Sequence, residues 1–241
     1  MDRMIYLSMS GAKATMQRQE TLANNLANVS TVGFRAELAA FCAVPVQGSG
    51  ASTRVYALES TPGYDPTPGQ IAATGRNLDV AMRGGAWLAV QALDGTEAYT
   101  RGGSLQTDAE GNLVTTAGLT VLGDAGPVQV PRDTVVSFAP DGTISATETN
   151  GHSSTIGRLK MVTPEGPLER GADGLFRAAE GELAADPDAR LTDGALESSN
   201  VSAVETMVSM IAAARQFEAQ MKLLSTAESN EKAAAQLLSV S

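Results

Sequence analysis

Two long segments at the ends of the chain contain almost no helix-breaking residues, and this feature most constrains the fold. Residues 3–28 contain one glycine, Gly11, and no proline, while residues 203–238 contain neither residue type. Glycine and proline are the least favourable residues in a helix interior. The intervening residues are rich in Gly, Pro, Asp and Thr. We therefore predict two terminal helices that flank a β-rich middle.

The N-terminal segment has apolar or small residues at alternating spacings of four and three. This 3.5-residue repeat is typical of a helix that pairs with another helix as a coiled coil. The repeat runs through Ile5, Met9, Ala12, Met16, Gln19, Ala23 and Leu26.

The C-terminal segment begins with a capping-box pattern, in which Ser202 would cap the helix and Glu205 would reach back to it. An apolar repeat of the same kind follows. Methionine is frequent in it, and methionine adapts to irregular neighbouring surfaces. We predict that residues 1–30 and 203–241 pair as a coiled coil and form one discontinuous assembly domain. The repeat consists of Ala203, Met207, Met210, Ala214, Phe217, Met221 and Leu224.

The predicted N-terminal helix ends in three asparagines, although asparagine is a mediocre helix former. One interpretation is that Asn28 is a left-handed C-cap and that the other two are solvated. The alternative is that Asn24 and Asn28, four residues apart on one face, form hydrogen bonds with a neighbouring helix. Gly33 then allows a turn, and Phe34 is expected to anchor the chain beyond that turn. The whole predicted assembly interface is Ile5, Met9, Ala12, Met16, Asn24, Asn25, Leu26, Asn28, Phe34, Met207, Met210, Ala214, Phe217, Met221 and Leu224.

The middle of the chain alternates short apolar runs with turn signals. Asp94-Gly95, Asp141-Gly142 and Asn150-Gly151 are strong hairpin turns because these residues tolerate positive φ. Regularly spaced short strands indicate an antiparallel barrel-like or sandwich domain. The predicted fold class is therefore α+β. We expect an extended arm over residues 31–75, a β-rich outer domain over 76–178 and a return linker over 179–202.

Charge is concentrated in the middle of the chain. The net charge of the chain is −10, and the ends contribute almost none of it. An acidic middle argues against nucleic acid as a partner, since nucleic-acid sites are basic. The first residues lack a basic region followed by an apolar run, so we expect no cleaved Sec signal. The sequence contains no run of 18 consecutive apolar residues, so we expect no transmembrane helix.

The sequence has few of the residue types that catalytic sites usually contain. The chain has one histidine, His152, in a Gly/Ser/Thr turn, and one cysteine, Cys42. A Ser–His or Cys–His nucleophile pair would have to use His152, and loop histidines are usually solvated. One histidine and one cysteine cannot form a zinc site of the usual kinds. We predict a protein that is not an enzyme and has no cofactor, no metal and no small-molecule substrate.

Several segments together resemble bacterial flagellar axial proteins, that is, the rod, hook and hook-associated subunits. Residues 23–35, ANNLANVSTVGFR, resemble the N-terminal signature of these proteins. Residues 75–81, GRNLDVA, and 99–103, YTRGG, are similar to their shared β domain. Residues 194–201, GALESSNV, and 217–220, FEAQ, are similar to the ending of the family. The short length and the opening residues favour a proximal rod subunit.

The resemblance implies a structural protein that polymerises into the tubular rod that crosses the periplasm and transmits torque. It implies export, without processing, through the flagellar type III export apparatus. It also implies that the terminal helices pack in an inner tube and that the β domain faces outward. The expected partners are other proximal rod proteins, the distal rod protein and further copies of the chain. The alternatives are a distal rod or hook subunit, and a secreted enzyme or adhesin with a helical stalk.

Overall fold

The computed structural model describes residues 2–45, 55–149, 151–179 and 181–239. It divides into two compact units. The helical unit comprises Met1–Val29, Ala36–Asp65 and Val201–Ser241, and the β unit comprises Ser30–Arg35 and Pro66–Asn200. Within the described residues, neither helix combines the length and the apolar character that crossing a membrane requires.

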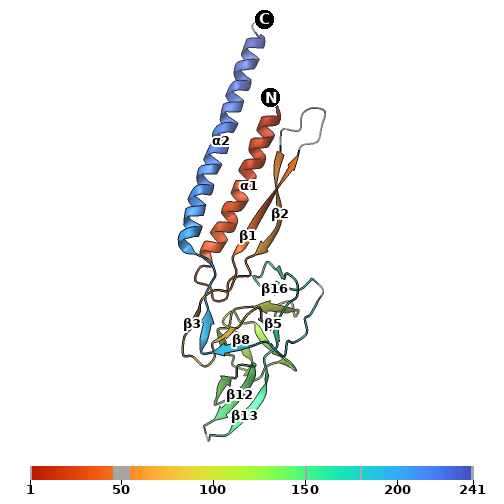
Figure 1. The fold of residues 1–241 in the computed structure, drawn as a ribbon, viewed down its shortest axis with the longest axis vertical. Helices are drawn as coiled ribbons and strands as arrows, with labels where there is room; N and C mark the ends of the chain where they lie inside the picture. The colour runs from red at the N-terminus through yellow and green to blue at the C-terminus, as the bar shows by residue number, and fades with distance from the viewer. Residues whose placement is uncertain (1, 46–54, 150, 180, 240–241) are drawn as a thin grey trace. The chain divides into compact units, whose positions relative to one another are not determined.

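The helical unit consists of two helices and one β-hairpin (Figure 1). Helix α1 spans Asp2–Ala27 and helix α2 spans Ala203–Ser239, close to the predicted bounds. Strands β1 (Glu37–Pro45) and β2 (Val55–Tyr64) pair antiparallel, with a register shift between Leu38 and Ala40. Helix α1 contacts α2 and both strands of the hairpin. Part of the expected arm, 31–75, is thus a hairpin beside α1.

The start of α2 agrees with the capping pattern. Ser202 Oγ accepts a hydrogen bond from the Glu205 N–H at 3.4 Å, and the Ser202 carbonyl accepts the Thr206 N–H at 3.0 Å. The first bond satisfies one of the donors that a helix N-terminus leaves without an intrahelical partner, and the second is the first intrahelical bond of α2.

The predicted coiled-coil pairing of the terminal helices is wrong. The two helices lie side by side and run in opposite directions (Figure 1). However, the expected seam residues Met9 and Met207 are 56% and 50% exposed. The buried positions carry small side chains instead, so no apolar knobs-into-holes seam forms. The structure supports an α+β fold without coiled-coil pairing, and the buried residues that replace the expected seam are Ser8, Thr15, Thr206 and Ala213.

Small side chains explain why the helices meet on a different face. A Cβ at Gly11 would lie 3.1 Å from the Gln220 side-chain amide carbon, so the end of the Gln220 side chain from α2 packs directly on Gly11 of α1. Thr15 can be buried because its Oγ1 donates a hydrogen bond to the Gly11 carbonyl at 2.8 Å. A face of glycine, serine and threonine was invisible to a search for apolar periodicity.

The described residues of the β unit form four antiparallel sheets. The largest has the order β15-β16-β6-β5-β9-β8-β7, with β10 on β9 and β14 on β5; β11-β12-β13 form a second sheet. The remaining sheets are the pairs β17–β4 and β18–β3. The strands are β3 (Ile71–Ala73), β4 (Val80–Met82), β5 (Trp87–Gln91), β6 (Glu97–Thr100), β7 (Leu105–Thr107), β8 (Leu113–Thr115), β9 (Thr120–Gly123), β10 (Gly126–Pro127), β11 (Thr134–Phe138), β12 (Thr143–Glu148), β13 (Ser153–Arg158), β14 (Met161–Val162), β15 (Glu169–Arg170), β16 (Phe176–Arg177), β17 (Leu191–Asp193) and β18 (Ala195–Glu197).

Two predicted hairpin turns are confirmed. Gly95 connects β5 to β6 with a φ of 83°, and Gly142 connects β11 to β12 with a φ of 87°. In each turn the preceding aspartate accepts hydrogen bonds from a threonine. Asp94 Oδ1 binds the Thr96 N–H at 2.9 Å. Asn150, of the third predicted turn, lies outside the described residues.

An apolar core fills the β unit. Its members come from most of the strands and are almost completely shielded from solvent. Burying such side chains supplies the main stabilisation of a folded domain. The best-buried members larger than alanine are Val80, Met82, Leu88, Val90, Leu105, Leu113, Val121, Ile144, Leu159, Met161 and Leu191.

Candidate assembly interface

The first two turns of α2 expose an apolar stripe. Val204 is 72% exposed, and Met207, Val208 and Ile211 are each at least half exposed. Residues three, four and seven apart lie on one face of a helix. Folded monomers seldom leave a contiguous apolar surface uncovered unless another molecule binds there. We define these four residues as the α2 stripe.

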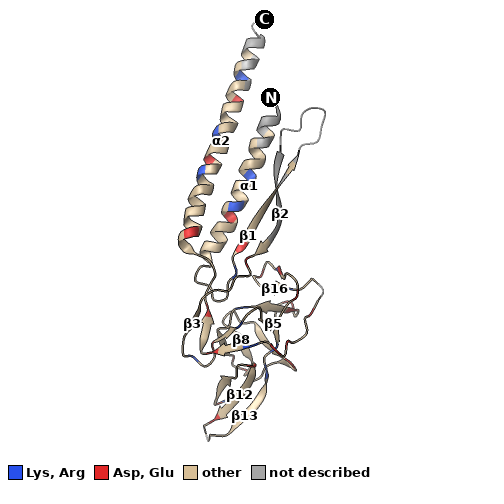
Figure 2. Cartoon of the chain, viewed as in Figure 1, with Lys and Arg blue, Asp and Glu red and all other residues tan. Residues whose placement is uncertain are grey.

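The α2 stripe lies in an uncharged stretch of the helix. Glu205 is the last charged residue before Arg215, so residues 206–214 contain no charge. Figure 2 shows this uncharged section of α2 between the acidic residue near its start and the basic residue beyond it. An uncharged apolar surface favours association by burial rather than by ion pairing.

Helix α1 also exposes large apolar side chains. Tyr6, Met9 and Met16 are each about half exposed. Their spacings of three and seven place them on one side of the helix. Lys13 lies four residues after Met9 and three residues before Met16, so it is on the same side of the helix, and it is exposed. This face of α1 is therefore apolar with one positive charge.

The structure divides the predicted interface residues into three groups. Met9, Met16, Asn24, Met207 and Met221 are exposed, so they are available to other molecules. Asn25 and Phe34 are buried within the chain. The side chain of Ile5 lies outside those described. The remaining residues are partly buried, namely Ala12, Leu26, Asn28, Met210, Ala214, Phe217 and Leu224.

Sequence reasoning missed most of the exposed apolar surface. Val204, Val208 and Ile211 form a second apolar row, one position after Ala203, Met207 and Met210. The search for a single 3.5-residue repeat selected one row and ignored its neighbour. A search for every apolar face of the helix would have found both rows.

The asparagines at the end of α1 bind the chain itself. The Asn25 amide donates to the Glu37 carbonyl at 2.9 Å and accepts the Glu37 N–H at 2.8 Å. Asn24 Nδ2 donates to Glu37 Oε2 at 3.1 Å. Asn28 Nδ2 donates to Asn24 Oδ1 at 2.8 Å. In the described contacts these side chains join the end of α1 to the start of β1, whereas one prediction had them bonded to a neighbouring helix.

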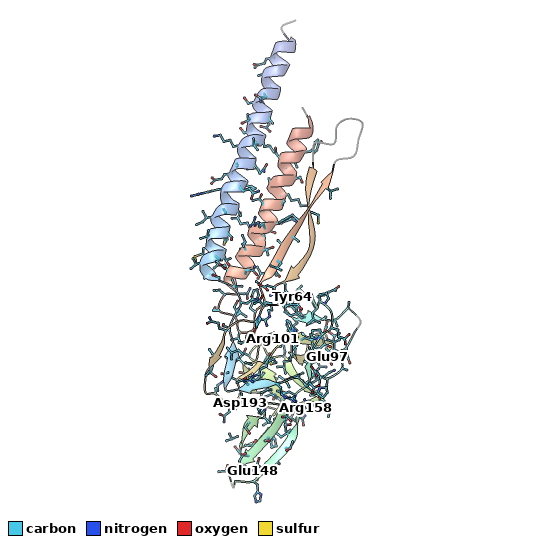
Figure 3. All side chains as sticks on the ribbon, viewed as in Figure 1. Tyr64, Glu97, Arg101, Glu148, Arg158 and Asp193 are labelled. Carbon is cyan, nitrogen blue, oxygen red and sulfur yellow. The ribbon has the colours of Figure 1, made fainter. Side chains whose placement is uncertain are left out.

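Within the β unit, a buried group of charges holds the short segment that comes after α1. Arg35 Nη1 lies 2.5 Å from Glu197 Oε1, and Arg101 Nη2 lies 2.5 Å from Glu197 Oε2. Glu197 is fully buried, and both arginines are 2% exposed. Burial lowers the pKa of the Arg101 guanidinium, and the Glu197 carboxylate opposes that shift. Figure 3 labels Arg101 on the β unit.

The charge triad Arg35–Glu197–Arg101 was not predicted. Its three residues are separated by 66 and 96 positions in the sequence, so no local periodicity relates them. Each lies inside a segment that carried the family resemblance, and that was the available signal. Phe34, which was expected to be an anchor, is buried, and its ring centroid lies 4.5 Å from Arg170 Cζ.

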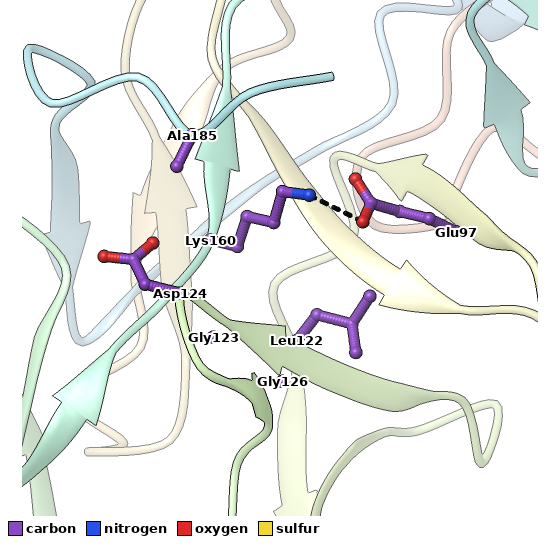
Figure 4. A pocket seen from close by; sticks show the side chains of 7 residues that line it. All are labelled: Glu97, Leu122, Gly123, Asp124, Gly126, Lys160 and Ala185. Carbon is purple, nitrogen blue, oxygen red and sulfur yellow. Dashed lines mark hydrogen bonds and ion pairs between the residues drawn. The ribbon is translucent and has the colours of Figure 1, made fainter. Parts of the chain in front are cut away.

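One recess in the β unit is lined by both charged and apolar residues (Figure 4). Its volume is about 380 Å³, and Lys160 Nζ forms an ion pair with Glu97 Oε2 at 2.6 Å across it. Tyr99 donates a hydrogen bond to Glu97 Oε1 at 2.9 Å, and burial raises the pKa of Tyr99 to about 12. The Lys160 and Glu97 charges in this recess are paired with each other, and Asp124 lines the recess as a further acidic residue. The lining residues are Glu97, Leu122, Gly123, Asp124, Gly126, Lys160 and Ala185.

Cys42 and His152 lie in different units of the chain. Cys42 is exposed on β1 in the helical unit, and His152 is exposed beside β13 in the β unit. Among the residues that the structure describes, no three His, Cys, Asp or Glu side chains are placed to hold a metal ion.

Three family models match consecutive parts of the chain. The model described as Flagella basal body rod protein matches residues 5–35. The model of the Flagellar hook protein FlgE/F/G D1 domain matches residues 81–146. The model of the Flagellar basal body rod FlgEFG protein C-terminal region matches residues 192–237. The matches include most of α1 with the VGFR segment, part of the β unit, and most of α2.

Curated relatives extend this similarity to the whole chain. The chain is 48% identical to Flagellar basal-body rod protein FlgF of Salmonella typhimurium and also to that of Escherichia coli strain K12. Each alignment covers 100% of this chain and 100% of the relative. The chain is 30% identical to Flagellar basal-body rod protein FlgG of Bacillus subtilis, over 94% of this chain and 95% of the relative. The chain therefore belongs to the family of flagellar basal-body rod proteins, as a structural subunit of that rod.

Proposed function

We propose that this rod subunit polymerises through the exposed apolar faces of its terminal helices. The observation that carries the proposal is the α2 stripe, Val204, Met207, Val208 and Ile211, which is exposed and uncharged. Covering apolar surface stabilises an assembly by about 25 cal/mol per Å². The exposed side chains of Tyr6, Met9 and Met16 on α1 add a second surface of the same kind.

Within the rod, the proposed neighbours are other rod subunits, including further copies of this chain. The flexible thioether side chains of Met9, Met16 and Met207 suit contact with neighbours that are similar but not identical. We further propose that the terminal helices belong to the inner part of the rod and that the acidic β unit faces outward. This arrangement would keep a hydrated surface on the outside of an axle that transmits torque.

A proximal position in the rod is part of the proposal. The short length and the opening residues support it, as does the higher identity to FlgF proteins than to a FlgG protein. We propose that the subunit reaches the periplasm through the flagellar type III export apparatus. The alternatives of a hook subunit, an adhesin and a secreted enzyme have less support, because full-length similarity is to proteins named as rod proteins.

The decisive experiment places a charge within the α2 stripe. Val208→Asp and Ile211→Asp should each abolish swimming in soft agar, because a buried unpaired carboxylate strongly destabilises an interface. Purified basal bodies from these strains should lack the subunit. Gln216→Asp is the matched control, since it adds the same charge at an exposed position of α2 away from the stripe.

Two further measurements separate assembly from folding and export. The near-ultraviolet spectrum of each purified variant should match that of the wild-type protein, because Trp87 lies in the β unit. The amount of each variant exported should also be unchanged. Normal swimming of strains carrying either stripe variant would refute the proposed role of the α2 stripe.

A further inference from the structure

Residues Ser30–Arg35 belong to the β unit although the chain on both sides of them belongs to the helical unit. The segment therefore enters the β unit, forms its contacts and leaves again within six residues. Its described long-range partners, which include Glu197 and Arg101, lie far away in the sequence. The β unit thus holds the segment in the way that a protein holds a bound peptide.

Gly33 forms the tightest contact of the segment. Its N–H donates a hydrogen bond to the Glu197 carbonyl at 2.8 Å, and its φ of 69° is unfavourable for residues with a Cβ. A Cβ at this position would lie 2.2 Å from the Arg101 carbonyl carbon. That distance is a severe overlap with the main chain, which cannot move aside as a flexible side chain could. The site therefore selects glycine.

Phe34 occupies a shielded position beside a cation. Its side chain is buried, and its ring centroid lies 4.5 Å from Arg170 Cζ. A guanidinium at that distance from an aromatic ring gives a cation–π attraction. The Phe34 carbonyl also accepts a hydrogen bond from the Asn200 N–H at 3.3 Å. The site therefore selects an aromatic side chain after the glycine.

Arg35 completes the contacts through the buried Glu197 carboxylate. Its Nη1 lies 2.5 Å from Glu197 Oε1. A charge-assisted hydrogen bond shielded from solvent is stronger than a neutral one. Lysine cannot reproduce the planar geometry of the guanidinium. The site therefore selects arginine after the aromatic residue.

The groups that receive the segment are held by other parts of the β unit. Glu197 Oε1 accepts the Gly69 N–H at 2.9 Å, and Oε2 accepts Arg101 Nε at 2.8 Å. Arg101 in turn donates to the carbonyls of Met82 and Gly84, both at 3.0 Å. None of these hydrogen bonds involves a residue of the Ser30–Arg35 segment. Residues outside the segment therefore also hold the two charged groups that contact it.

We propose that the β unit contains a peptide-binding site specific for Gly-Phe-Arg. The chain fills this site with its own residues 31–35, and the site accepts the same segment from a second copy when its own is displaced. This inference goes beyond the proposed assembly through the helices and does not depend on it. Exchange of a short segment between identical chains is a low-cost route to linking them.

A full-length variant that cannot seat its own segment provides the test. Gly33→Val should leave the site open, because it adds a branched side chain where a Cβ already overlaps Arg101. A fluorescein-labelled peptide of residues 29–37, VSTVGFRAE, should then bind, as measured by fluorescence anisotropy. The wild-type chain should bind the peptide at least about tenfold more weakly, because its own segment is present at a high effective concentration.

Matched controls define the specificity. Gly75→Val introduces the same side chain at a φ of 71°, with no atom within 4 Å of the added Cβ. It should bind the peptide no better than the wild-type chain does. Peptides carrying Phe34→Ala or Arg35→Gln should bind the Gly33→Val variant at least about tenfold more weakly than the native peptide.

Trp87 fluorescence distinguishes the outcomes. If Gly33→Val is folded, with native Trp87 emission, and fails to bind roughly 1 mM native peptide, the proposal is overturned. If the variant is unfolded, the native peptide should restore Trp87 emission, because a ligand that binds only the folded state stabilises it. Failure of the native peptide to restore emission, or equal restoration by the Arg35→Gln peptide, would also overturn the proposal.

Discussion

The β unit buries many of its large apolar side chains, whereas the helical unit exposes several of its own. In the β unit, residues such as Leu88, Leu113 and Ile144 are fully buried in a continuous core. In the helical unit, Met9 and Val204 are exposed, and the best-shielded helix positions include Thr15 and Ala213. A unit that buries its apolar residues can stabilise itself, whereas one that exposes them depends on other molecules.

This contrast indicates a division of labour within the rod subunit. The β unit has the core that makes a domain independent of its neighbours. Among the described helix side chains, Ala213 is the one apolar residue that is buried, and helices gain most of their stability from packing an apolar face. The comparison therefore predicts large effects of substitutions inside the β unit and small effects of most substitutions in the helices of the free subunit.

The largest expected effect is that of Glu197→Gln. The substitution leaves Arg35 and Arg101 buried without a carboxylate, and breaking a buried ion pair in this way costs about 3–5 kcal/mol. Urea denaturation followed by Trp87 fluorescence should show this loss, because Trp87 is the one tryptophan and is buried in the β unit. Glu110→Gln, at an exposed position of the same unit, should change stability by less than about 0.5 kcal/mol. Equal stabilities of the two variants would show that the triad does not stabilise the β unit.

A pair of truncations tests the contrast between the two units directly. Leu88→Ala removes a fully buried core side chain and should cost about 2–5 kcal/mol, measured by the same urea titration. Met16→Ala removes a half-exposed side chain from α1 and should change stability by less than about 0.5 kcal/mol. Circular dichroism at the helical band monitors this second variant, because both helices lie in the helical unit. A large loss of helix in Met16→Ala would contradict the view that this face awaits a partner.

The same contrast explains which features were predictable from the sequence. Helix bounds and hairpin turns depend on local composition, so residues 3–28 and 203–238 and the turns at Gly95 and Gly142 were predicted correctly. Which helix face is buried depends on tertiary packing. Gly11, which the Gln220 side chain covers, and the buried Ser8 lie on a face that apolar periodicity cannot reveal. Arg35, Arg101 and Glu197 meet only after the β unit has folded, so their triad had no local signal.

The smallest expected effect concerns the aspartates that cap turns in the β unit. Hydrogen bonds from Thr96 lower the pKa of Asp94, and hydrogen bonds from Thr143 lower the pKa of Asp141. A carboxyl group whose pKa is lower in the folded state stabilises that state fully above its unfolded pKa of about 3.9. The stabilisation disappears as the pH falls through the lower folded value. Both groups are exposed, so solvent screening keeps each contribution small.

Urea midpoints of the β unit measured at pH 6 and at pH 2.5 should therefore differ less in the double variant Asp94→Asn, Asp141→Asn than in the wild-type chain. Asparagine keeps one acceptor oxygen for the threonine N–H of each turn but does not titrate, so it removes the charge while retaining that backbone hydrogen bond. The matched control is Asp188→Asn, another exposed aspartate of the β unit. An unchanged pH dependence in the double variant would assign the acid sensitivity of the β unit to other groups. That result would also mean that the core and the charge triad account for the stability of the β unit above pH 5.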